Sequence, residues 1–116
     1  MRTSKKIVNK KAKDPIDVLI FDKGVRAKDL VIYKQLDLMI LILNNGNVFT
    51  FSISDYPRLR HASEKDLKSW KMIGGGIGFH WEKLDEDLSL KGFIQSAALN
   101  NTLKSITIKN GLLAVN

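Results

Sequence analysis

Residues 36–53 read LDLMILILNNGNVFTFSI and decide how the first half of the chain folds. Leu36–Leu43 predicts a strand that is buried on both sides, because both of its faces are apolar over its second half. Asn45-Gly46 then favours a two-residue type I′ hairpin turn, in which both central residues have positive φ. The next strand, Asn47–Ile53, alternates between apolar and polar residues and has one apolar side. That side carries Phe49, Phe51 and Ile53.

Two shorter apolar runs precede this hairpin, and both are typical of strands. They are Ile16–Phe21, after Asp14-Pro15, and Leu30–Tyr33. The first half is therefore expected to form an antiparallel β-meander of three to four strands with one face that needs a cover. Residues 103–116 predict a C-terminal β-hairpin that turns at Lys109-Asn110-Gly111 and either closes the sheet or lies apart from it.

Two short helices in the second half are expected to supply the cover, which makes the fold class α+β. Ser63 is a favourable N-cap for a helix over Glu64–Lys71, and the glycines from Gly74 to Gly78 are expected to end that helix. An extended segment over Gly78–Leu84 follows. Ser89 then favours a second helix, whose apolar residues recur at helical spacing: Leu90, Phe93, Ile94 and Ala97, before Asn100-Asn101 stop it.

The chain has 116 residues and a formal net charge of +7, but that charge is concentrated at one end. Residues 1–13 carry six basic and no acidic side chains, whereas the other 103 residues carry 13 basic and 12 acidic ones. We therefore expect a flexible basic arm over residues 1–14 and a single domain over 15–116. The absence of cysteine excludes disulfides and thiolate metal sites. No signal peptide or transmembrane segment is apparent, which favours a cytoplasmic protein.

Several residues could carry chemistry. The glycine run lacks the preceding strand and following helix of a phosphate loop, so a helix stop with a tight turn is favoured. Arg58 and Arg60 are expected to pair internally with the acids at 85–87, or to bind an anion. His61 offers a base for Ser63 or Ser89, although no spacing indicates a catalytic pair. His80 and the acids at 85–87 suggest either a metal or acid–base site, or a half-buried histidine beside an acidic helix start.

The middle of the chain also resembles a known family. In order, it reads Asp55-Tyr56-Pro57-Arg58-Leu59, Ala62-Ser63, Trp70, Ile73-Gly74-Gly75-Gly76, Gly78-Phe79-His80-Trp81 and Leu84-Asp85-Glu86-Asp87-Leu88-Ser89. This order is similar to that of the bacterial domain-of-unknown-function family 2442, over about residues 30–95. The resemblance implies a small α+β domain without an established catalytic activity. It also implies an antitoxin-like role beside a small partner protein that a neighbouring gene encodes.

We therefore expect a non-enzymatic, antitoxin-like protein without a cofactor, which neutralises a small partner protein by direct binding. A homodimer remains open, and no membrane partner is expected. The candidate partner-binding residues belong to the motif: Tyr56, Pro57, Arg58, Leu59, Trp70, Gly76, His80, Trp81, Asp85, Glu86 and Asp87. One alternative is a metal-dependent domain centred on His80 and Asp85–Asp87. Another is a DNA- or RNA-binding protein that contacts phosphates through its arm. The arm residues are Arg2, Lys5, Lys6, Lys10, Lys11 and Lys13.

Overall fold

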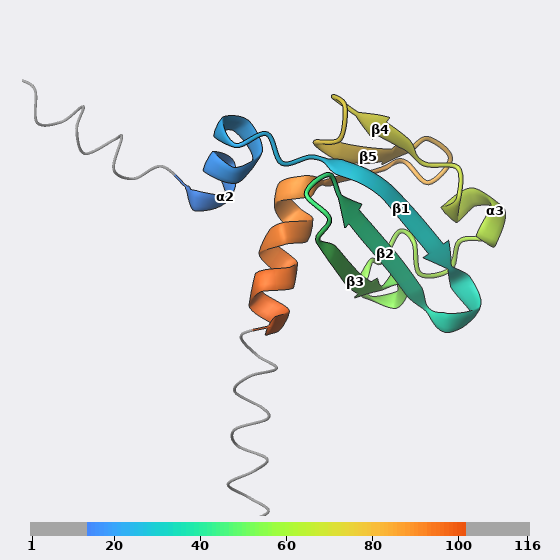
Figure 1. Cartoon of the computed structure of the whole chain (residues 1–116). Helices are drawn as coiled ribbons and strands as arrows, with labels where there is room; N and C mark the ends of the chain where they lie inside the picture. The colour runs from blue at the N-terminus through green and yellow to red at the C-terminus, as the bar shows by residue number, and fades with distance from the viewer. Residues whose placement is uncertain (1–13, 102–116) are drawn as a thin grey trace, which may run out of the picture.

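The computed structural model describes residues 14–101. Its first sheet lies within residues 27–52, where the sequence predicts strands (Figure 1). Strands β1 (Ala27–Tyr33), β2 (Leu38–Leu43) and β3 (Val48–Ser52) form an antiparallel sheet in the order β1-β2-β3. A 3₁₀ turn, η2 (Lys34–Leu36), joins the first two strands, and a second, η3 (Ile53–Asp55), follows β3. The predicted strands in this region are confirmed, with small changes at their ends.

The turn between β2 and β3 is one residue longer than a two-residue type I′ turn. Leu43 donates its N–H to the Asn47 carbonyl at 2.9 Å, and Gly46 donates to the Leu43 carbonyl at 3.1 Å. Gly46 has a φ of 89°, whereas Asn45 is not among the described non-glycine residues with positive φ. The prediction of a type I′ turn is therefore wrong, because the loop has three residues and only its glycine needs the left-handed region.

Strand β2 is buried on one face and not on two. Met39 and Leu41 are fully buried, and Leu43 is nearly so, whereas the alternate residues Leu38 and Ile40 are only half-buried. The prediction that this strand is covered on both sides is wrong. Other elements of the described chain pack on only one face of the first sheet, which is the face directed away from the viewer in Figure 1.

A second three-stranded antiparallel sheet follows, where the sequence indicated only one extended segment. It contains β4 (Lys71–Ile73), β5 (Gly78–Trp81) and β6 (Glu86–Ser89) in the order β4-β5-β6. The glycine run therefore connects two strands, and the prediction that it ends a helix is wrong. The tight turn itself is confirmed, because all three glycines at positions 74–76 have positive φ. The acids at 85–87 accordingly lie in a turn and on β6.

The two predicted helices are present at different lengths. Helix α3 spans only Glu64–Leu67, and the Ser63 hydroxyl accepts a hydrogen bond from the Asp66 N–H at 3.1 Å. The second helix, here called the C-terminal helix, covers residues 90–101 of the described chain. Its predicted cap is confirmed, since the Gly92 N–H donates to the Ser89 hydroxyl at 2.9 Å. Where this helix ends lies outside the described residues, as do the basic arm over 1–13 and the hairpin predicted over 103–116.

The run from Ile16 to Phe21 is helical, so the strand predicted there is wrong. It forms a short helix, α2 (Pro15–Asp17), which continues as a π-helical turn, η1 (Val18–Asp22). Asp14 caps this segment by accepting a hydrogen bond from the Ile16 N–H at 2.7 Å. Pro15 fits the first helical position because that position needs no N–H donor. The local cap thus outweighs the β-propensity of the branched residues.

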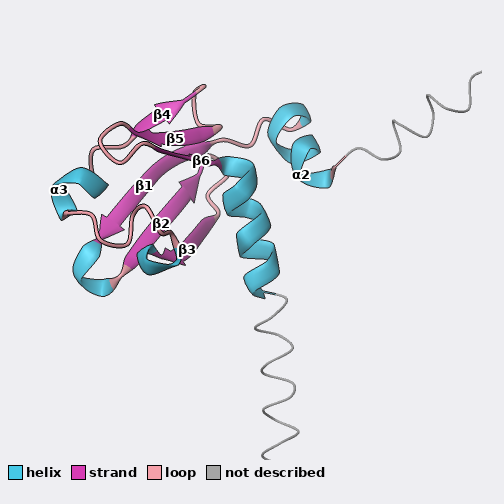
Figure 2. Cartoon of the chain, turned by 180° about the vertical axis from the view of Figure 1, so that it is seen from behind, coloured by secondary structure: helices cyan, strands magenta, loops and turns pink. Residues whose placement is uncertain are grey.

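A single core joins both sheets and the C-terminal helix. Phe79 and Trp81 of β5 are fully buried, and Phe93 of the helix lies between the sheets, with its ring centroid 4.9 Å from that of Phe51 and 6.0 Å from that of Phe79. The first sheet is therefore covered by a second sheet and a long helix, and not by two short helices (Figure 2). Within residues 14–101, no helix has the length and apolar character needed to cross a membrane.

Candidate functional site

The aromatic residues of the motif hold the fold together. Trp81 is fully buried, and its indole N–H donates to the Leu67 carbonyl at 2.8 Å. Trp70 is half-buried, and its indole N–H donates to the Leu30 carbonyl at 3.1 Å. The Trp81 indole therefore connects β5 to α3, and the Trp70 indole connects the residue before β4 to β1. Leu59 is fully buried as well, so neither it nor Trp81 is free to contact a partner.

Gly76 belongs to the same structural framework. Its carbonyl accepts a hydrogen bond from the Ala27 N–H at 2.8 Å, which connects the β4–β5 turn to the start of β1. A Cβ atom at this position would lie 2.4 Å from the Ala27 carbonyl oxygen, and the φ of Gly76 is 117°. Only glycine fits this approach without strain. The role of Gly76 is therefore to let the two sheets meet.

The Tyr56–Arg60 segment presents a mixed surface. Tyr56 is half-buried against Phe93, and this burial, followed by the charge of Asp55, raises the pKa of its hydroxyl. Pro57, Arg58 and Arg60 are exposed. Neither arginine forms an ion pair with the acids at 85–87 anywhere in the described chain, so the predicted internal pairing is wrong. The segment turns so that Leu59 lies in the core and Tyr56 packs against it, while the two arginines face solvent.

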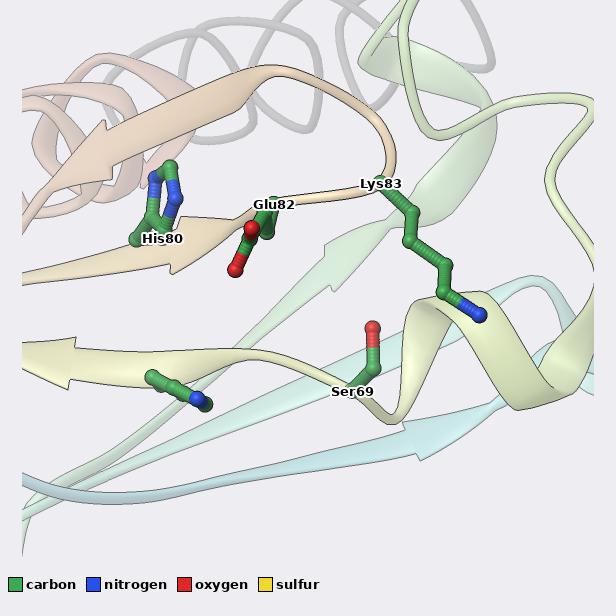
Figure 3. A pocket seen from close by; sticks show the side chains of 5 residues that line it. Ser69, His80, Glu82 and Lys83 are labelled. Atoms are coloured by element: carbon green, nitrogen blue, oxygen red, sulfur yellow. The ribbon is translucent and has the colours of Figure 1, made fainter.

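A shallow hollow of about 310 Å³ lies on the exposed side of the second sheet, around His80 (Figure 3). The His80 Nδ1 lies 2.5 Å from the Asp87 Oδ1, and their side chains are 40% and 66% exposed. Lys71 stands opposite His80 on β4, and Glu82 and Lys83 follow β5. The His80 ring and the Glu82 carboxylate point in opposite directions, while Lys83 extends toward α3. The charged side chains that line the hollow are therefore exposed to solvent on an open surface.

The acids after β5 do not gather around His80. Asp85 lies in the turn with a φ of 51°, and Glu86 stands opposite Trp81, on the other face of the sheet from His80. Only Asp87 reaches the imidazole. Within residues 14–101, no group of three histidine or acidic side chains is placed to hold a metal ion. The alternative of a metal-dependent domain therefore lacks a ligand set in this part of the chain.

The serines near these groups are engaged in local structure. Ser69, which lines the hollow, donates its hydroxyl to the Asp66 carbonyl at 2.6 Å. Ser63 and Ser89 both accept hydrogen bonds as helix caps, and His61 is exposed in the loop before α3. In the described part of the chain, these contacts do not bring a serine hydroxyl and a histidine together. The arrangement does not indicate nucleophilic catalysis.

The feature that the sequence reasoning missed is the second face of the first sheet, which we call the outer face. Its side chains form three rows across β1, β2 and β3, because residues that pair directly project on the same side. Six of the nine positions are apolar or aromatic, and none of the six belongs to the buried core or packs against it. The rows are Tyr33–Leu38–Ser52, Val31–Ile40–Thr50 and Asp29–Ile42–Val48.

The outer face is open in the described structure. In Figure 1 this face is turned toward the viewer, and no helix or further strand lies across it. Tyr33 is 42% exposed and Val48 is 53% exposed, while the four apolar residues between them are half-buried. The signal was present in the sequence, since β2 is apolar at every position. A strand that is apolar on both faces predicts burial inside the domain, but the same pattern is compatible with one face that binds another protein.

Comparisons with known proteins agree with this fold but carry no function. Residues 31–97 match the family described as "Protein of unknown function (DUF2442)". A crystal structure of a protein of unknown function from Rhodospirillum rubrum is 34% identical, with a TM-score of 0.56 over 63% of this chain and 88% of that one. An NMR structure of an uncharacterized protein from Chromobacterium violaceum has a TM-score of 0.57, with 18% identity over 82% of this chain and 83% of that one.

No curated protein matches the chain. The family match spans more than half of the chain and includes β2, β3, both tryptophans and most of the C-terminal helix. The relative from R. rubrum adds a similar fold at substantial identity. The chain belongs to the DUF2442 family.

Proposed function

We propose that this chain is a non-enzymatic, antitoxin-like binding protein that neutralises a small partner protein by direct contact through the outer face of its first sheet. The observation that carries the proposal is the open apolar array on β1, β2 and β3. Contiguous apolar patches on soluble domains mark interaction sites more often than isolated exposed residues do. The proposal moves the binding surface away from the motif, because Leu59 and Trp81 are fully buried and the indole of the half-buried Trp70 is bonded within the fold.

The shape of the outer face favours a helix as the part of the partner that binds. The two outer strands are separated by two strand spacings, which amount to about 10 Å, and the paired length of five residues is about 17 Å. An α-helix with side chains is about 10 Å wide, and roughly twelve residues span that length. We therefore propose that the partner presents one amphipathic helix, with its apolar side against Ile40 and Ile42.

The polar residues of the array support this orientation. Asp29 and Ser52 lie at opposite corners, and Thr50 lies at the edge beside Ile40. The centre of the face is thus apolar while its polar groups lie at the rim, as in other protein–protein interfaces. A DNA- or RNA-binding role through the arm stays a prediction, because residues 1–13 are outside the described chain.

The proposal is tested by co-expressing the chain with the toxic product of its neighbouring gene. Ile40→Lys places a charge at the centre of the outer face, and Ile73→Lys is the matched control, because Ile73 is an exposed isoleucine on β4. We expect the wild type and Ile73→Lys to relieve toxicity and to co-purify with the partner, and Ile40→Lys to do neither. Near-UV circular dichroism of the tryptophans verifies that both variants are folded.

Two results contradict the proposal. If the wild type neither binds the neighbouring product nor relieves its toxicity, the antitoxin-like role is wrong. If Ile40→Lys remains folded and binds as tightly as Ile73→Lys, the partner does not use the outer face.

A further inference from the structure

The two edges of the first sheet differ in their free backbone groups. At the β1 edge, the Ala27 N–H is bonded to the Gly76 carbonyl. The Leu30 N–H donates to the Asp29 carboxylate at 2.8 Å, and the Leu30 carbonyl accepts from the Trp70 indole at 3.1 Å. A register shift between Ala27 and Asp29 adds an irregularity to the same strand. Such features prevent further strands from adding to an edge.

The β3 edge lacks these features. Leu43 and Asn47 form a hydrogen-bonded pair at the turn, so antiparallel alternation directs the backbone groups of Val48, Thr50 and Ser52 away from β2. Within residues 14–101, no hydrogen-bond partner is found for these outward groups. The strand contains no lysine, proline or bulge. It therefore presents a regular edge that can accept another strand.

A groove of about 520 Å³ beside this edge gives an incoming strand access to the outward groups of Val48 and Thr50. The start of β3 forms one wall of the groove. The last described turn of the C-terminal helix forms the other wall through Ala97, Asn100 and Asn101. The amide side chains of the two asparagines add hydrogen-bond donors and acceptors next to the edge. The surroundings of the edge are therefore polar and uncharged.

Strand β3 is complementary to a second copy of itself. Its sequence, VFTFS, has no charged side chain, so two copies meet without like charges opposite each other. Antiparallel pairing about the middle residue places Thr50 opposite Thr50 of the second copy, and Val48 opposite Ser52 of the second copy. Because these residues direct their backbone groups outward, each opposed pair exchanges two N–H···O bonds. A second copy thus satisfies the outward groups of the whole strand.

We infer that two copies of the chain pair through β3 in an antiparallel dimer whose two-fold axis passes between the two Thr50 residues. The strand order of the joined sheet is β1-β2-β3-β3-β2-β1. Because the β1 edges are blocked, the sheet stops at two copies and the dimer is closed. The axis is perpendicular to the sheet, so the outer faces of the two copies lie side by side on the same surface. The inference concerns the β3 edge alone and does not depend on the proposed partner.

Sedimentation equilibrium of the full chain, without any partner, tests the inference through the exposed side chain of Thr50. We expect the wild type to dimerise. Thr50→Lys and Thr50→Glu should each raise the dissociation constant of the dimer about tenfold or more, because each places like charges directly opposite each other. An equimolar mixture of the two variants should restore the dimer, since opposite charges then face each other across the axis.

Ile40→Lys is the matched control for a charge on the same face of the sheet. Ile40 pairs with Thr50 from the neighbouring strand, so in the dimer the two substituted positions are three strand spacings apart. That separation is about 14 Å, which exceeds the screening length of about 8 Å at physiological salt. We therefore expect Ile40→Lys to dimerise as the wild type does.

Amide hydrogen exchange followed by NMR gives a second readout at the edge itself. The Thr50 N–H of the wild type should exchange about tenfold or more slowly at protein concentrations above the dissociation constant of the dimer than below it. The Phe49 N–H, which faces β2, should be protected at both concentrations and reports that the sheet is intact.

Several results would overturn the inference. One is a wild type that sediments as a monomer at the concentrations used for NMR. Another is protection of the Thr50 N–H that does not depend on concentration, which assigns the edge to a segment of the same chain. A third is a mixture of Thr50→Lys and Thr50→Glu that fails to dimerise although the wild type does. Loss of the dimer in Ile40→Lys but not in the Thr50 variants would assign self-association to the outer face instead.

Discussion

Gly76 offers a sharp test of how the motif acts, because the structure distinguishes it from its neighbour Gly75. A methyl group at position 76 meets the Ala27 carbonyl oxygen at 2.4 Å, the Ala27 nitrogen at 3.0 Å and the Arg26 Cβ at 3.1 Å. A methyl group at position 75 meets no atom within 4 Å. Both glycines have positive φ, 117° and 70°. Gly75→Ala is therefore the matched control for Gly76→Ala.

The expected magnitudes follow from these contacts. Gly75→Ala suffers only the left-handed backbone penalty of about 1–2 kcal/mol. Gly76→Ala adds a stronger backbone strain, and the overlap with β1 forces a shift that costs about 1–3 kcal/mol. The shift also weakens the bond between the Ala27 N–H and the Gly76 carbonyl, which contributes about 1 kcal/mol. We expect Gly76→Ala to be less stable than Gly75→Ala by about 2–4 kcal/mol.

Urea unfolding followed by tryptophan fluorescence measures this difference, since Trp81 is fully buried in the native state. The free energies of unfolding of the wild type and both variants are compared after verifying that each depends on the urea concentration with the same slope. An equal slope shows that the variants expose the same surface on unfolding. If Gly76→Ala and Gly75→Ala agree within about 0.5 kcal/mol, the packing of Gly76 against β1 is not a structural requirement.

Three further predictions concern other parts of the fold. Trp81→Phe should lower the free energy of unfolding by about 2–3 kcal/mol, because it leaves a small cavity and removes the bond to the Leu67 carbonyl; a loss below about 0.5 kcal/mol contradicts this. His80→Ala should change it by less than about 1 kcal/mol, since the pair with Asp87 is largely solvated; a loss above about 2 kcal/mol in urea unfolding would give the pair a structural role. The hydrogen bond from the Ile16 N–H and the ammonium group of Lys91 lower the pKa of Asp14 below its ordinary value of 3.8. The stabilisation that the Asp14 carboxylate gives to the fold is therefore present above pH 3.8 and is lost as the pH falls through the lowered pKa. An NMR titration midpoint of Asp14 at or above 3.8 is inconsistent with this cap.

The strands of the first sheet could be predicted because their pattern is local. Alternation along β3 places Phe51 in the core, and this prediction is confirmed. Ile16–Phe21 shows the limit of such reasoning. Its branched residues favour a strand, yet Asp14-Pro15 begins a helix there, and the ion pairs of Lys91 with Asp14 and Asp17, at 3.3 Å and 3.0 Å, attach that helix to the C-terminal helix. Those pairs join residues far apart in sequence, so no local pattern reveals them.

The second sheet was missed for a related reason. Its strands have three or four residues each, too few for alternation to be distinguished from a loop. They are stabilised by distant contacts, such as the bond from the Trp81 indole to Leu67. The motif residues pointed to the family, and the family match confirms that prediction, but their role in binding a partner stays a prediction. A buried tryptophan that stabilises a fold and an exposed one that binds a partner look the same in a single sequence.

The most direct test of the central claim is a map of the bound surface that does not depend on substitutions. Methyl-labelled full-length protein is titrated with the purified product of the neighbouring gene, and the NMR signals of isoleucine, leucine and valine are followed. We predict that the methyl groups of Ile40, Ile42 and Val48 shift together, while those of the buried core residues Leu59 and Leu67 do not. Binding that leaves the methyl groups of Ile40, Ile42 and Val48 unchanged would contradict the assignment of the outer face as the partner's binding site.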